Sequence, residues 1–185
     1  MTFFQQKGEC LMKKKILLVF CALVMLISGT VYAAGAPDYL NGDTNFILTG
    51  SRQGTGYYLD KSSLVITYED TKTRELAVNV LVASVPYNDF DLELADNPKI
   101  RSVATLYYKY DVDTHRMYKK SSSDEEWRIF NPNGTTAETG SDFSGELAYY
   151  IAYKEKFSDG HLYTDASGKE RPASFSDEFY ARADR

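Results

Sequence analysis

The segment from Leu76 to Val85 restricts the chain to folds built around a buried β-strand, because apolar side chains occupy nearly every position in it. One face receives Leu76, Val78, Val80 and Val82, and the other receives Ala77, Asn79, Leu81 and Ala83. Successive side chains of a strand point to opposite faces of its sheet. A strand that is apolar on one face and nearly so on the other is typical of the middle of a sheet. We therefore expect 76–85 to be a central strand, which Pro86 ends.

Short β-branched and aromatic runs, separated by Gly, Ser and Asp, predict further strands around the central one. These runs are 46–48, 57–59, 64–68, 102–111, 116–119 and 126–130. The polar residues 69–73 predict a tight hairpin turn into the central strand. Because the runs follow one another along the chain, with an acidic loop at 87–99 after the central strand, we expect a meander of antiparallel strands.

One segment, 144–157, has helical periodicity. Its apolar stripe at i, i+3 and i+4 spacing consists of Leu147, Tyr150, Ile151 and Phe157. Ser144 or Asp142 is placed to cap the first amides, and Glu146 lies near the positive end of the helix. The predicted fold class is α+β: an antiparallel, meander-like β-sheet packed by one C-terminal helix.

The N-terminal residues have the three-part layout of a secretory signal peptide. A basic run, 13–15, precedes 12 apolar residues, 16–27, and small side chains follow at Val31 and Ala33. Twelve helical residues span about 18 Å, against about 30 Å for a bilayer core, so a membrane anchor is not expected. We expect cleavage after Ala33, with a true start at Met12, and a protein that is periplasmic, secreted or loosely surface-associated.

The remaining chain is expected to form a single domain, because about 150 residues suffice for one core. Residues 34–45 are rich in Gly, Pro, Asn and Asp and are interpreted as a linker. The α+β domain is placed at 46–157. Residues 158–185 are interpreted as a polar C-terminal extension with a short helix near 176–182.

Charge and cysteine content exclude several classes of function. Cys10 and Cys21 both precede the expected cut, so the mature chain offers no disulfide, thiol nucleophile or cysteine metal site. The chain has 21 basic and 26 acidic residues, of which four basic residues and one acidic residue lie before the cut. The mature chain therefore has 17 basic and 25 acidic residues and a net charge of −8. A chain of that sign repels phosphate backbones and anionic lipids, so neither nucleic acid binding nor membrane insertion after cleavage is expected.

No catalytic, cofactor or metal site is expected from the motifs. The sequence contains no HExxH, GxSxG or glycine-rich phosphate loop. Residues 111–115 are similar to the start of a calcium loop, but Arg116 and Ser122 stand where that loop needs glycine and glutamate. A carboxylate pair, Asp142 with Glu146 or Glu125 with Glu126, leaves open a hydrolase acting on carbohydrate.

Tyrosine is abundant: 14 of the 15 tyrosines follow the expected cut. Tyrosines are good strand and core residues, and they are also enriched at binding surfaces. Tyr149 and Tyr153 lie off the apolar helix stripe, and Tyr57 and Tyr58 point to opposite faces of their strand. Unless another layer covers them, some of these rings are exposed, so these four tyrosines form the candidate interaction surface.

Two segments carry a resemblance to a known family: YYLDKSSL at 57–64, followed by the apolar strand, and WRIFNP at 127–132, before the predicted helix. Over 46–157 the chain resembles the bacterial surface-adhesin protein E family. The resemblance implies a small α+β domain and binding of host matrix proteins such as laminin or vitronectin. The family's adhesin is lipid-anchored, whereas Cys21 lies inside the apolar run, and no ligand-binding segment carries over.

The predicted function is that of a non-catalytic, extracytoplasmic binding module with a protein partner in the host matrix or the bacterial envelope. Two alternatives stay open. One is the secreted, carboxylate-dependent hydrolase. The other is a subunit of an envelope assembly, for which a homo-oligomer is expected.

Overall fold

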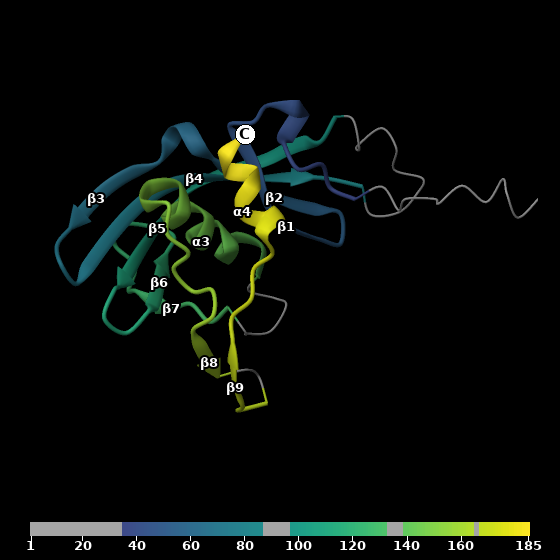
Figure 1. The fold of residues 1–185 in the computed structure, drawn as a ribbon. Coiled ribbons are helices and arrows are strands. Elements are labelled where there is room, and N and C mark those ends of the chain that lie inside the picture. The colour runs from purple at the N-terminus through teal and green to yellow at the C-terminus, as the bar shows by residue number, and fades with distance from the viewer. Residues whose placement is uncertain (1–34, 87–96, 133–138, 165–166) are drawn as a thin grey trace, which may run out of the picture. The chain divides into compact units, whose positions relative to one another are not determined.

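The computed structural model describes residues 35–86, 97–132, 139–164 and 167–185. It is an α+β fold in which helix α3 crosses one face of an antiparallel seven-stranded sheet (Figure 1). The strands are β1 (Phe46–Arg52), β2 (Thr55–Asp60), β3 (Val65–Glu69), β4 (Thr73–Ser84), β5 (Lys99–Asp111), β6 (Arg116–Lys120) and β7 (Arg128–Ile129). Their order is β1-β2-β4-β5-β6-β7, and β3 also pairs with β4. The predicted fold class is confirmed.

Strand β4 is the centre of the sheet, as its apolar pattern predicts. It pairs with β5 along its whole length, while β2 pairs with 80–84 and β3 with 74–77 on its other edge. Leu76 and Val78 are fully buried in the main core, whereas Leu81 and Ala83 are buried in a second, smaller core. Both faces of β4 are apolar because the main core covers one face at Leu76 and Val78, and the second core covers the opposite face at Leu81 and Ala83.

The second core depends on the segment that precedes β1, where the interpretation of 34–45 as a linker is wrong. Leu40, only 2% exposed, packs with Leu48 and Tyr58 in this core. The Tyr58 hydroxyl also donates a hydrogen bond to the Pro37 carbonyl at 3.1 Å. Gly, Pro and Asn set the local turns here, while Leu40 packs in the core and Asp38 forms an ion pair with Arg182 at 2.9 Å.

Helix α3 (Thr139–Tyr153) begins and ends earlier than predicted. Ser144 lies within the helix, and its Oγ is 2.9 Å from Oγ1 of the buried Thr49, so Ser144 is not a cap. The helix ends where Lys154 adopts a left-handed conformation with φ of 57°. Phe157 is therefore outside the helix, although it is buried. No helix in the described part of the chain is long and apolar enough to cross a membrane.

Helix α3 lies unusually close to the sheet at Gly145. A Cβ at this position would come within 2.5 Å of the Met117 sulfur and 2.7 Å of the Tyr108 ring. The Tyr110 hydroxyl donates to the Gly145 carbonyl at 2.8 Å in the same buried contact. The close approach is possible because glycine has no side chain.

The interpretation of 158–185 as an extension is also wrong. This segment forms a hairpin of β8 (Leu162–Thr164) and β9 (Glu170–Pro172), then the predicted short helix as α4 (Asp177–Ala181). Phe179, Tyr180 and Ala183 belong to the main core. The segment covers the side of α3 that faces away from the sheet, so 144–149 is buried all round.

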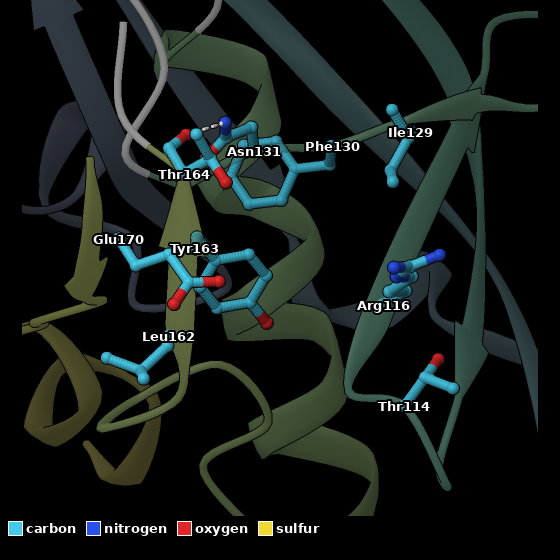
Figure 2. A pocket seen from close by; sticks show the side chains of 9 residues that line it. All are labelled: Thr114, Arg116, Ile129, Phe130, Asn131, Leu162, Tyr163, Thr164 and Glu170. Atoms are coloured by element: carbon cyan, nitrogen blue, oxygen red, sulfur yellow. Dashed lines mark hydrogen bonds between the residues drawn. The ribbon is translucent and has the colours of Figure 1, made fainter. Parts of the chain in front are cut away.

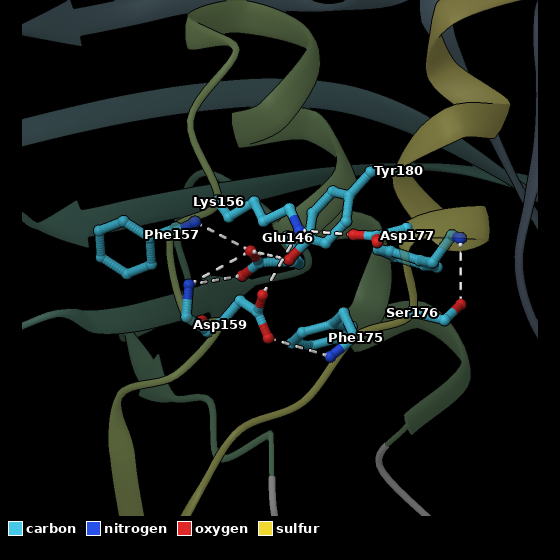
Figure 3. A network of polar contacts seen from close by, with 10 residues as sticks. Glu146, Lys156, Phe157, Asp159, Phe175, Ser176, Asp177 and Tyr180 are labelled. Atoms are coloured by element: carbon cyan, nitrogen blue, oxygen red, sulfur yellow. Dashed lines mark hydrogen bonds and ion pairs between the residues drawn. The ribbon is translucent and has the colours of Figure 1, made fainter.

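A buried carboxylate joins these layers (Figure 3). Glu146 is 0% exposed. Its Oε1 accepts hydrogen bonds from the Phe157 amide and the Tyr180 hydroxyl, both at 2.9 Å, and its Oε2 accepts from the Ser158 amide at 3.0 Å. One side chain of α3 thus fixes both the chain that leaves the helix and α4.

Replacing Glu146 with alanine is expected to destabilise the fold by roughly 3–5 kcal/mol, because three buried donors lose their acceptor. Urea denaturation followed by circular dichroism measures this change in unfolding free energy. Glu126→Ala is the matched control, because Glu126 is exposed. Equal midpoints for the two variants would contradict the assigned role.

Burial also raises the pKa of Glu146 above its ordinary value of 4.5, although the hydrogen bonds it accepts oppose this shift. The folded state then holds the proton more tightly than the unfolded state. The resulting stabilisation is complete below the unfolded pKa and is lost as the pH rises through the folded pKa. We expect the difference in unfolding free energy between wild type and Glu146→Gln to fall over this window, measured by denaturation from acidic to neutral pH. A pH-independent difference would refute the shift.

Candidate functional site

The four tyrosines predicted to form an interaction surface do not form one. Tyr58 and Tyr149 are buried, 0% and 2% exposed, and Tyr57 and Tyr153 are half-buried against the main core. The Arg74 guanidinium carbon lies 4.1 Å from the centre of the Tyr153 ring, and its Nη1 contacts the Tyr149 hydroxyl. Tyr149 packs against Tyr110 of the sheet, and Tyr58 packs in the second core beneath the segment around Leu40.

An open surface lies instead on the face of the sheet opposite α3. The second core covers this face near β1, β2 and one half of β4. From β3 to β7 no described residue packs over it, and exposed apolar side chains remain there. They include Val65, 55% exposed, Val103, 56% exposed, and Ile129, 61% exposed. These three side chains lie on different strands and in different rows of the register, with Tyr107 and Tyr118 as neighbours in two of the rows.

Strand register sets the outward side chains of this face in rows across the sheet. One row is Tyr68, Glu75, Lys109, Tyr118 and Ile129, and its neighbour is Val65, Ala77, Tyr107 and Lys120. Trp127 precedes β7 and reaches the lysines of both rows. We call Tyr107, Lys109, Tyr118, Lys120 and Trp127 the aromatic face.

The two lysines of the aromatic face are held among its rings. Lys109 Nζ lies 4.9 Å from the ring centre of Tyr118 and 5.0 Å from that of Trp127. Lys120 Nζ lies 4.6 Å from the Trp127 ring and 5.6 Å from the Tyr107 ring. A cation near an exposed ring face contributes about 0.5–1 kcal/mol. The rings and ammonium groups are thus partly ordered before any partner arrives.

The sequence does contain a signal for this surface. Alternation along β5 separates Tyr107 from Tyr108 and Tyr110, which the structure buries fully. Alternation alone assigns the two faces but does not say which one is covered. Trp127 lies outside β7 as the structure has it, so no strand pattern marks its direction.

The carboxylate pairs do not form a hydrolytic centre among the described residues. Glu146 is enclosed by its hydrogen-bond donors, and the side chain of Asp142 lies outside the described residues. Glu125 accepts a hydrogen bond from the Ser121 amide at 2.9 Å, within an exposed turn. Glu126 follows it on the surface.

The calcium-like segment is the turn between β5 and β6. Asp111 accepts a hydrogen bond from the Thr114 amide at 3.0 Å, and backbone donors of this kind lower the pKa of its carboxyl group. Lys72 forms an exposed ion pair with Asp113 at 3.8 Å. Over the described ranges, no group of three His, Cys, Asp or Glu side chains is arranged to hold a metal ion.

Comparisons with family models, with curated proteins and with solved structures find no match. The resemblance to the surface-adhesin protein E family therefore stays a prediction. The function has to be argued from the geometry of the chain itself.

The aromatic face is expected to contribute little to stability. Tyr107→Ala should lower the unfolding free energy by about 1 kcal/mol or less, because this ring is half-exposed and carries only a cation–π contact. Its neighbour Tyr108 is fully buried, so Tyr108→Ala should cost about 3–5 kcal/mol. Thermal and urea denaturation of both variants test the pair. Similar losses in the two would show that the outer face is covered.

Proposed function

We propose that this protein is a non-catalytic binding module that works outside the cytoplasm and recognises a protein partner through the aromatic face. The observation that carries the proposal is the combination of one tryptophan, two tyrosines and exposed apolar neighbours on the uncovered part of the sheet. Trp and Tyr are the residues most enriched among binding hot spots. The predicted signal peptide supports the location.

Charge favours a partner that presents carboxylates. The chain as a whole carries a net charge of −5, yet Lys109 and Lys120 place two cations among the rings. An acidic segment of a partner can neutralise both ammonium groups while its apolar atoms cover Trp127. Such complementarity directs the approach of the partner and fixes its register.

A binding assay tests the proposal. Residues 34–185 should bind immobilised laminin or vitronectin, the matrix proteins that the resemblance implies, or a protein isolated from envelope extracts by pull-down. Trp127→Ala with Tyr118→Ala should weaken binding at least about tenfold, since hot-spot residues contribute 2 kcal/mol or more. Biolayer interferometry at two salt concentrations measures both affinity and charge dependence.

Leu162→Ala is the matched control, because Leu162 is 63% exposed but lies on the separate β8–β9 hairpin. Its affinity should equal that of the wild type. Unchanged binding by the Trp127 and Tyr118 double variant, with an intact circular dichroism spectrum, would show that the aromatic face is not the binding surface. A protein that binds only itself in light scattering would favour an assembly subunit instead.

A further inference from the structure

A pocket of about 420 Å³ lies between the edge of the main sheet and the β8–β9 hairpin (Figure 2). Small-molecule sites in proteins usually measure about 300–1,000 Å³. The lining residues are Thr114, Arg116, Ile129, Phe130, Asn131, Leu162, Tyr163, Thr164 and Glu170. They come from β6, β7, β8, β9 and two connecting segments, so tertiary packing, and no single loop, shapes the pocket.

Hydrogen bonds fix the hairpin beside the sheet. The Asn131 side-chain amide donates to the Thr164 carbonyl at 2.5 Å, and the Tyr163 hydroxyl donates to the His115 carbonyl at 2.5 Å. The His115 and His161 rings stack with centres 3.5 Å apart at the base of the hairpin. The pocket is therefore held open by contacts that need no ligand.

Two opposite charges face each other across the pocket. Figure 2 shows Arg116 on the sheet side and Glu170 on the hairpin side, with Tyr163 between them. Both charged residues are exposed, and the Arg116 guanidinium interacts electrostatically with the Asp111 carboxylate. Asp111 is the register partner of Arg116, but its carboxylate accepts the Thr114 amide in the turn.

The lining between the charges combines polar side chains with an apolar part. Phe130 is 5% exposed and closes the inner side, while Ile129 and Leu162 are 61% and 63% exposed at the rim. A ligand that fits must carry a negative group for Arg116, a positive group for Glu170 and an apolar body between them.

We propose that this pocket binds short zwitterionic peptides with apolar side chains. The peptide carboxylate pairs with the Arg116 guanidinium, which suits planar carboxylates. The peptide ammonium pairs with Glu170, and its side chains lie on Phe130 and Tyr163. None of the five residues of the aromatic face lines the pocket, although Ile129 is the register partner of Tyr118, and the inference does not depend on the proposed function.

Titration of isotope-labelled protein with the dipeptide leucyl-phenylalanine, followed by NMR, tests the proposal. We expect saturable shifts at the pocket residues with a Kd of roughly 0.1–1 mM, as for a small ligand with few contacts. N-acetylation or C-terminal amidation of the dipeptide should each weaken binding about tenfold, because each removes one charge-assisted contact. Trp127→Ala should leave this binding unchanged.

Variants assign the two charges separately. Arg116→Gln should weaken binding of the free dipeptide about tenfold but leave binding of the amidated dipeptide unchanged. Glu170→Gln should also weaken binding of the free dipeptide about tenfold but leave binding of the N-acetylated dipeptide unchanged. Arg128→Gln and Glu126→Gln are exposed controls that do not line the pocket, and they should bind as wild type. Absence of saturable shifts up to about 10 mM, or equal binding of the capped and free dipeptides, would overturn the proposal.

Discussion

The arrangement of layers in this protein depends on the buried carboxylate of Glu146. A carboxylate without water is costly unless donors surround it, and here three donors come from two separate stretches of the chain, 157–158 and α4. Because Phe157, Ser158 and Tyr180 must all reach the same side chain, the C-terminal segment has to fold back over α3. A hydrophobic contact tolerates sliding, whereas these hydrogen bonds fix position and direction.

This constraint decides which surfaces are free. The C-terminal segment covers the outer side of α3, α3 covers one face of the sheet, and the segment around Leu40 covers the opposite face near β1 and β2. Among the described residues, the uncovered area is the face that β3 to β7 turn away from α3. The same folding back places β8 and β9 beside the edge of the sheet, which creates the pocket.

The parts of the fold that could be predicted are those set by local pattern. Period-two alternation locates the strands and indicates that both faces of β4 are apolar, because the alternation depends only on residues that are neighbours in the sequence. The contact of Tyr149 with Tyr110 of the sheet joins distant segments, and the polar composition of the C-terminal segment hides Phe179 and Tyr180. For the aromatic face, alternation separates Tyr107 from Tyr108, but only the position of α3 shows which of the two rings is exposed.

An open sheet face with aromatic rings needs an explanation, because such faces favour aggregation. The ammonium groups of Lys109 and Lys120 lie over the rings, so charged, strongly hydrated groups border the apolar surface. A partner carboxylate can draw each ammonium aside at small cost, since each cation–π contact is worth only about 1 kcal/mol. The lysines therefore protect the rings from nonspecific contacts while leaving them available to an acidic partner. Lys109 and Lys120 therefore cover the rings in the free protein and are also the residues that would bind the partner's carboxylates.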